Sequence, residues 1–203
     1  MKKVLTIVVA LVGFYSLSYA EQPIEVLQKS IDKSINILND SNYKDQSQKE
    51  LQRQKLWLEL KHIYDFKAFS KRVLARHWRK FTPSQREEFV ELFGHFVNVY
   101  YLSRLQEKYN NEKITLLEQN LISYTKAVVK ASVRWKNQEV PIEIKMLKRG
   151  DSWKIYDLSA LGISAISFYR GQFQAILQKE SPEDVIEKLK EKIKMAEEKL
   201  HKK

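Results

Sequence analysis

The chain has 203 residues, a formal net charge of +11 and no Cys. Without Cys, disulfides, thiol catalysis and zinc–thiolate sites are all excluded. A chain of this length is sufficient to bury a full hydrophobic core within one domain.

The first 20 residues have the three parts of a cleavable secretory signal peptide. Lys2 and Lys3 precede an almost wholly apolar run over 4–14, and the small residues Ser18 and Ala20 follow at the positions that a signal peptidase reads. The apolar run is shorter than the ~20 residues of a membrane-spanning helix, and no Cys follows it to carry a lipid anchor. We therefore expect cleavage after Ala20, export, and one mature domain over 21–203.

Export changes the meaning of the positive charge. In a cytosolic protein such a charge suggests nucleic acid, whereas an exported protein meets phospholipid headgroups and acidic protein surfaces. Much of the charge lies in the last helix, where lysines and glutamates also keep a protein in solution. We expect no nucleic-acid partner, and a transient contact with a membrane surface remains open.

Helical periodicity covers the first half of the chain and returns near its end. Thr82-Pro83-Ser84-Gln85 has the form of a capping box with Pro at the first helical position. Apolar spacing of about 3.6 residues predicts helices over 23–38, 46–63, 66–78, 82–109 and 164–178, and over 181–203.

The final, Lys-rich helix carries an apolar stripe at Val185, Leu189 and Ile193. We expect this stripe to pack on the domain and to leave the lysines in solvent. The alternative is a basic amphipathic helix that binds a membrane surface.

Between the helices, the period changes from helical to alternating. Residues 113–119 alternate weakly, and 125–135, 140–146 and 153–158 form three further strands. The connections between them are short turns, at Asn137-Gln138 and Arg149-Gly150-Asp151, so the strands must be antiparallel. The sequence predicts an α+β fold in which helices gather on one face of a curved, four-stranded antiparallel sheet.

A catalytic set is not evident. The four histidines, at 62, 77, 95 and 201, lack metal-ligand spacing, and the segment 162–166 lacks the second Gly of a nucleophile elbow. Asp65 and Asp157 stand apart from other catalytic groups in the sequence. We predict no metal, no cofactor and no enzyme activity. One alternative stays open: a small-molecule enzyme or binder with a cone-shaped α+β cavity and Asp157 or Asp65 as its base.

Three groups of segments occur in a characteristic order: 65–74 with Trp78-Arg79, 82–93 with Tyr100 and Leu105, and 153–158 with 162–164, 169–173 and 176–177. Together they resemble the MlaC (toluene-tolerance) family, the periplasmic phospholipid-binding component of the Mla lipid-transport pathway. The resemblance extends over nearly all of 23–200. Two features depart from it: the family often has Gly where this chain has Ala75, and the final helix is unusually rich in Lys.

The resemblance implies a non-enzymatic carrier in the periplasm, with N-terminal helices, the sheet and C-terminal helices packed around an apolar cavity. Its ligand would be a phospholipid. Its partners would be an outer-membrane lipoprotein complex and the lipid-binding subunit of an inner-membrane ABC transporter, in a pathway that maintains outer-membrane lipid asymmetry. A diacyl lipid has on the order of 30 CH₂ groups, each costing ~0.8 kcal/mol to expose to water, so a carrier must replace the bilayer with an apolar cavity. A ligand-free basic periplasmic adaptor is a further alternative.

The cavity is expected to combine the sheet with two helices. The candidate lining residues are Val133, Trp135, Ile142, Ile144 and Met146 from the sheet, and Phe93, Val97, Tyr100, Phe168 and Tyr169 from the helices. Gly94, inside a helix, is expected to admit a close neighbour, either protein or an acyl chain.

Arg170 is the candidate for holding the phosphate at the cavity mouth. An anion buried without a partner is costly, and a guanidinium pairs well with phosphate. The same cation would otherwise dock an acidic partner surface or pair with Asp157 or another carboxylate inside the domain.

Overall fold

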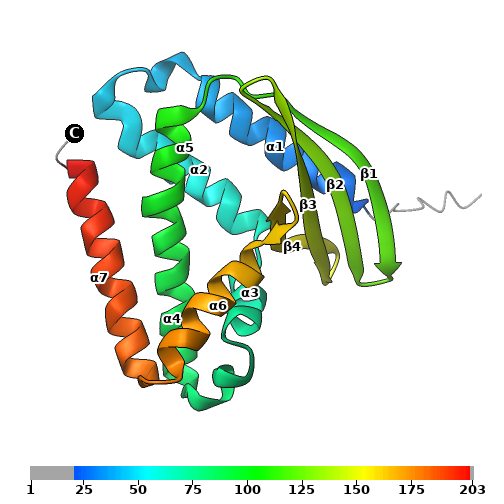
Figure 1. The fold of residues 1–203 in the computed structure, drawn as a ribbon. Coiled ribbons are helices and arrows are strands. Elements are labelled where there is room, and N and C mark those ends of the chain that lie inside the picture. The colour runs from blue at the N-terminus through cyan, green and yellow to red at the C-terminus, as the bar shows by residue number, and fades with distance from the viewer. Residues whose placement is uncertain (1–20, 202–203) are drawn as a thin grey trace, which may run out of the picture.

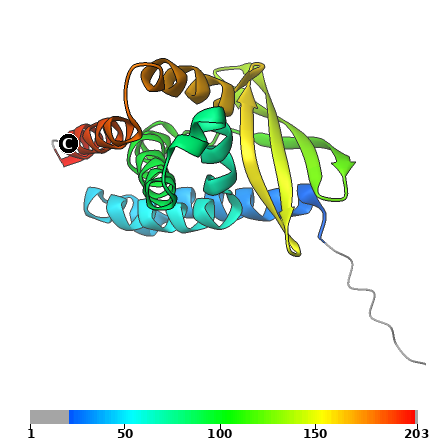
Figure 2. The same cartoon turned by 90° about the horizontal axis from the view of Figure 1, so that it is seen from below.

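The computed structural model describes residues 21–201, so the expected signal peptide over 1–20 lies outside the described residues. The chain begins with helix α1 (Pro23–Asn39), two short 3-10 turns and helix α2 (Lys49–Ile63). Helix α3 (Phe66–Leu74) and a 3-10 segment (Ala75–Lys80) follow. Helices α1 and α2 lie side by side (Figures 1 and 2).

Helix α3 ends four residues before the predicted boundary at Trp78. Asp65 caps its start by accepting a hydrogen bond from the Ala68 N–H at 2.7 Å. Ala75, at its end, has a φ of 48° and a ψ of −120°, which no α-helical residue adopts. The helix therefore stops there, and the next turn is a 3-10 helix.

The predicted helix over 82–109 is a rod of three parts: α4 (Pro83–Phe96), a π-helical segment (Val97–Leu102) and α5 (Ser103–Lys108). The capping box at its start is confirmed, because the Gln85 N–H donates to Thr82 Oγ1 at 3.2 Å and the Thr82 N–H donates to Gln85 Oε1 at 2.9 Å. The sequence periodicity did not reveal the π-helical segment. Such segments are rare and occur often at functional sites.

The sheet is antiparallel throughout and follows chain order: β1 (Ile114–Ser123), β2 (Lys126–Trp135), β3 (Gln138–Arg149), β4 (Ser152–Ala160) and β5 (Ile163–Ser164). The α+β class is as predicted. The described sheet has five strands rather than four, because β5 has two residues and is too short to show an alternating pattern.

Helix α6 (Ala165–Leu177) leads away from β5, and α7 (Pro182–His201) returns alongside the rod of α4, the π-helical segment and α5 (Figures 1 and 2). The predicted stripe of α7 is buried, with Val185, Leu189 and Ile193 exposed by 1, 3 and 5%. These side chains pack in a core shared by α3, α4, the π-helical segment and α6.

A second core fills the inner face of the sheet. Val129 of β2 pairs with Ile144 of β3, and both belong to a buried cluster with Leu27 of α1 and Ile63 of α2. The alternation that predicted these strands thus comes from contact with α1 and α2. The apolar face of the central strands is occupied by protein.

Candidate functional site

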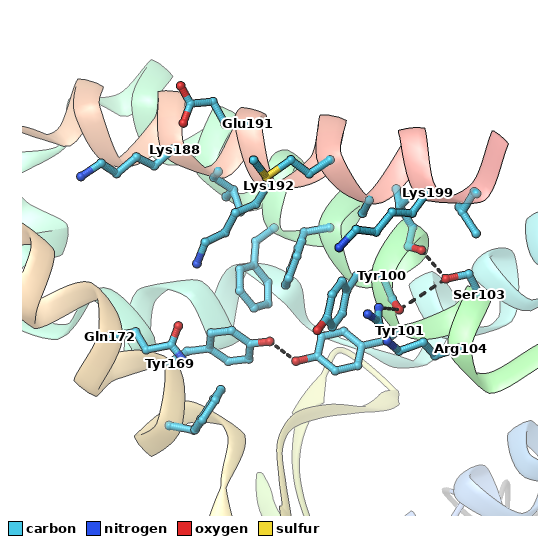
Figure 3. A pocket seen from close by; sticks show the side chains of 18 of the residues that line it. Tyr100, Tyr101, Ser103, Arg104, Tyr169, Gln172, Lys188, Glu191, Lys192 and Lys199 are labelled. Atoms are coloured by element: carbon cyan, nitrogen blue, oxygen red, sulfur yellow. Dashed lines mark hydrogen bonds between the residues drawn. The ribbon is translucent and has the colours of Figure 1, made fainter. Parts of the chain in front are cut away.

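A large cavity lies on the other side of the molecule, among the helices. It has a volume of about 1000 Å³ and opens between the rod of α4, the π-helical segment and α5 on one side and α6 and α7 on the others (Figure 3). Aromatic and aliphatic side chains form its interior, among them Phe96, Phe173, Ile176 and Leu189. This volume is at the upper end of the ~300–1,000 Å³ that is common for small-molecule sites.

A second cavity of about 500 Å³ adjoins the first, between the start of α6, the end of β4 and helices α2 and α3. No charged residue is among the described residues that line it. Four aromatic residues line both cavities: Phe93, Tyr101, Phe168 and Tyr169.

A pair of tyrosines forms the boundary between the two cavities. Tyr101 comes from the π-helical segment and Tyr169 from α6, and their hydroxyl groups are hydrogen-bonded (Figure 3). The Tyr169 ring packs edge-on against Phe93, with the centroids 5.0 Å apart. Burial and the bond to Tyr101 raise the pKa of Tyr169, so its hydroxyl stays neutral and able to donate.

The larger cavity is amphiphilic. Its charged lining residues are five basic and two acidic: Arg104, Lys108, Lys188, Lys192, Lys199, Glu107 and Glu191. All seven belong to α7 or α5, and six of them are exposed, at the rim. The two cavities together therefore present a basic rim, an aromatic middle and an apolar end.

The structure brings together only part of the predicted lining. Phe93, Tyr100, Phe168 and Tyr169 line the larger cavity, and Val97 lines the smaller one with three of these four. The predicted residues of β2 and β3 line neither of the two cavities: Val133, Trp135, Ile142, Ile144 and Met146. Ile144 and Met146 are exposed by 5 and 0% and pack in the core under the sheet.

Arg170 also lies outside both linings. Its guanidinium donates two hydrogen bonds to the backbone oxygen of Arg72, through Nε at 3.0 Å and Nη2 at 2.8 Å. These bonds join α6 to α3, so Arg170 has an internal structural role. Its partner is a carbonyl oxygen, not the carboxylate of Asp157.

Asp157 and Asp65 likewise hold elements together. Asp157 is 3% exposed and accepts hydrogen bonds from Ser164 Oγ at 2.7 Å and from the Ile166 N–H at 3.1 Å, at the start of α6. Asp65 caps α3 and also accepts from Arg149 Nε at 2.8 Å. Neither carboxylate lines either cavity, so neither is placed to act as a base on a ligand there.

Gly94 admits a protein neighbour rather than a ligand. A Cβ at this position would lie 3.1 Å from Cη2 of Trp57 on α2, which is tighter than ordinary van der Waals contact. The missing side chain thus lets α2 pack closely against α4.

The row of lysines on the cavity side of α7 and the pair of tyrosines between the cavities were not predicted from the sequence. Lys188, Lys192, Met195 and Lys199 are separated by four, three and four residues, a spacing that puts them on one face of the helix. The spacing can be read from the sequence, but the sequence does not show that the rod and α6 face this side of α7. Tyr101 was overlooked because a regular α-helix gives no reason to select it over Tyr100.

Within residues 21–201, no three His, Asp or Glu side chains gather as a metal site requires. In the same part of the chain, no helix combines the length and apolar character of a membrane span.

Comparisons with known proteins agree with one another. The family model described as MlaC protein matches residues 28–191. The toluene tolerance protein ttg2D of Pseudomonas putida is 29% identical over 119 residues, which are 58% of this chain and 55% of that protein, so the match spans about half the length of this curated relative.

The solved structure of a phospholipid-binding protein from Ralstonia solanacearum, in complex with a phospholipid, has the same fold with a TM-score of 0.72. The match covers 84% of this chain and 96% of that one at 19% identity.

Proposed function

Because this chain belongs to the MlaC family, we propose that it binds a phospholipid in the cavity between the α4–α5 rod, α6 and α7 and carries it through the periplasm. The observation that carries this proposal is the amphiphilic cavity itself. A volume of about 1000 Å³ with an apolar interior and a charged rim suits a molecule with apolar chains and a charged end.

The chemistry of the lining supports a carrier rather than an enzyme. The polar groups at the cavity are tyrosine hydroxyls, an amide, a serine and charged side chains at the rim. Binding and release of a lipid need no covalent step, whereas exposure of its chains to water would be prohibitive. The phospholipid complex of the Ralstonia solanacearum protein, which has the same fold, supports this ligand class.

The carrier would exchange its lipid with membrane-bound partners on both sides of the periplasm. We propose that these are an inner-membrane ABC transporter, through its lipid-binding subunit, and an outer-membrane lipoprotein complex, as the family resemblance implies. The sequence feature that supports the location is the signal-peptide pattern over 1–20.

The test begins with the lipid content of the purified protein. Mass spectrometry of an organic extract should give about one phospholipid or more per protein. The variant Ile176→Trp should reduce that content severalfold, because the larger side chain would occupy the cavity from α6, where Ile176 is only partly buried.

The matched control is Val133→Trp. Val133 is also partly buried and apolar, but it lies on β2 and lines neither cavity. Lipid content should be unchanged in this variant if it remains folded, as judged by circular dichroism. Loss of lipid in Val133→Trp with retention in Ile176→Trp would place the site under the sheet and contradict the helical cavity. A wild-type protein that never yields phospholipid would contradict the function itself.

A further inference from the structure

The helix α7 has two chemically different sides. On the side away from the cavity, Lys190 forms ion pairs with Glu187 at 2.8 Å and Glu88 at 2.9 Å. On the cavity side stand Lys188, Lys192 and Lys199, together with Met195. The lysines of the cavity side therefore line the cavity, whereas Lys190 does not.

Two of these lysines form no ion pair with any residue that the structure describes. Lys188 is paired with Glu180, whereas among residues 21–201 neither Lys192 nor Lys199 has an ion-pair partner. Figure 3 shows both side chains extending from α7 toward the tyrosine side of the cavity. The lining has five cations against two carboxylates, Glu107 and Glu191, and this excess of positive charge disfavours the empty site and favours an anion.

A third cation faces them from the rod. The Arg104 guanidinium stacks on the Tyr100 ring, 3.5 Å from its centroid, and Nη1 donates to the Tyr100 backbone oxygen at 2.9 Å. Arg104 is thus held at the same rim, opposite α7 (Figure 3). Its remaining N–H groups can still donate to an acceptor, since a guanidinium has five.

The polarity of the two cavities gives the ligand a direction. The larger cavity has charged lining residues, whereas none of the described residues that line the smaller cavity is charged. A lipid would therefore place its chains toward the tyrosine boundary and the smaller cavity. Its phosphate would remain at the rim, because an unpaired buried anion is costly.

We infer that Lys192 and Lys199, with Arg104, form an anion site that selects lipids with a net negative headgroup over zwitterionic lipids. The inference rests on the proposed function, since it names the lipid class that the cavity takes. Phosphatidylglycerol satisfies the uncompensated lysines with its one negative charge. The ammonium group of phosphatidylethanolamine cancels that charge and would be repelled by the same lysines.

The experiment uses the delipidated protein, incubated with vesicles of equal parts phosphatidylglycerol and phosphatidylethanolamine. After separation, mass spectrometry gives the ratio of the two bound lipids. Wild type should be enriched in phosphatidylglycerol. The double variant Lys192→Gln/Lys199→Gln should lower that enrichment roughly fivefold or more, by the strength of a lysine–anionic lipid contact, with total bound lipid little changed.

The matched control is Lys179→Gln/Lys194→Gln, which removes the same charge. Both lysines are exposed and line neither cavity. This control lowers the attraction of the whole protein to anionic vesicles as much as the test variant does. It should nevertheless keep the wild-type ratio, because it leaves the lysines of the cavity in place. An unchanged ratio in Lys192→Gln/Lys199→Gln, or an equal loss in the control, overturns the inference.

Inorganic phosphate separates a lipid headgroup from a free anion as the ligand. Titration of the delipidated protein with phosphate should give no saturable heat of binding, since the site gains its affinity from burial of the acyl chains. Saturable phosphate binding that disappears in Lys192→Gln/Lys199→Gln would overturn the lipid assignment. If wild type binds neither lipid, the proposed function has failed before the question of selectivity arises.

Discussion

Ala75 has a backbone conformation that does not suit its side chain. It has a φ of 48° and a ψ of −120°, a region that L-residues other than Gly rarely adopt. Its N–H donates to the Lys71 oxygen and so closes the last turn of α3. The conformation is thus imposed by the end of the helix.

We predict that Ala75→Gly stabilises the protein by about 1 kcal/mol. The strain relieved is roughly 1–3 kcal/mol, and the extra entropy of Gly in the unfolded chain cancels roughly 0.5–1 kcal/mol of it. Urea unfolding measures the change. The control is Ala175→Gly, an exposed position inside α6, which should lose about 1 kcal/mol. A loss of stability at both positions would contradict the account of α3.

At the scale of elements, a hydrogen bond between two tyrosine hydroxyl groups joins the π-helical segment to α6. The i→i+5 pattern of a π-helix widens the turn and accompanies a stretch in which Tyr100 and Tyr101 both line the larger cavity. Tyr101 bonds to Tyr169 there, at the boundary of the two cavities. We expect a lipid chain that extends from one cavity to the other to separate these hydroxyl groups.

We therefore predict that Tyr169→Phe accelerates lipid exchange. Loss of a hydrogen bond worth about 1 kcal/mol lowers the barrier to opening and should raise the rate up to about fivefold. Transfer of a fluorescent phospholipid between donor and acceptor vesicles measures that rate. Tyr100→Phe is the control, because it removes a hydroxyl group from the same segment and keeps the ring that contacts Arg104. The exchange rate of this variant should match that of wild type. Equal rates in all three proteins would show that the pair does not limit exchange.

At the scale of the whole molecule, the protein consists of two hydrophobic cores and a cavity beside one of them. The sheet, α1 and α2 form one packed unit, and the remaining helices form another around an open space. Helices α4, α6 and α7 lose contacts wherever that space is empty. A ligand that fills it stabilises the folded state by mass action.

We predict that removal of bound lipid lowers the melting temperature by about 5–10 °C. This follows from about 2.7 kcal/mol at a ligand concentration of 100 Kd and from about 2–4 °C per kcal/mol for a protein of this size. Differential scanning calorimetry of the protein before and after delipidation measures the difference. In Ile176→Trp the difference should shrink, because the added ring already occupies part of the space. An unchanged melting temperature in wild type would contradict a cavity that depends on its ligand.

The sequence by itself determined the elements and their class. Local signals suffice for this: the capping box at Thr82, the apolar stripe of α7 and the alternation of β2 and β3 can each be read from a short stretch of the chain. The ordered set of segments also identified the family, which the family model over 28–191 confirms. The boundary of α3 and the π-helical segment were missed because both depend on local geometry that apolar spacing does not encode.

Only the tertiary structure decided which apolar faces enclose space. A residue that packs on another helix and a residue that lines a cavity are equally apolar, so Ile144 and Phe93 gave the same signal in the sequence. Ile144 meets α1 and α2 and is core, whereas Phe93 belongs to the core among the helices and also lines the space between the rod, α6 and α7. The same holds for charge: Arg170 is bound to a backbone oxygen and Lys192 faces a cavity. The physical reason is that an empty volume is a property of how distant elements are placed, and no periodicity along one element can specify it.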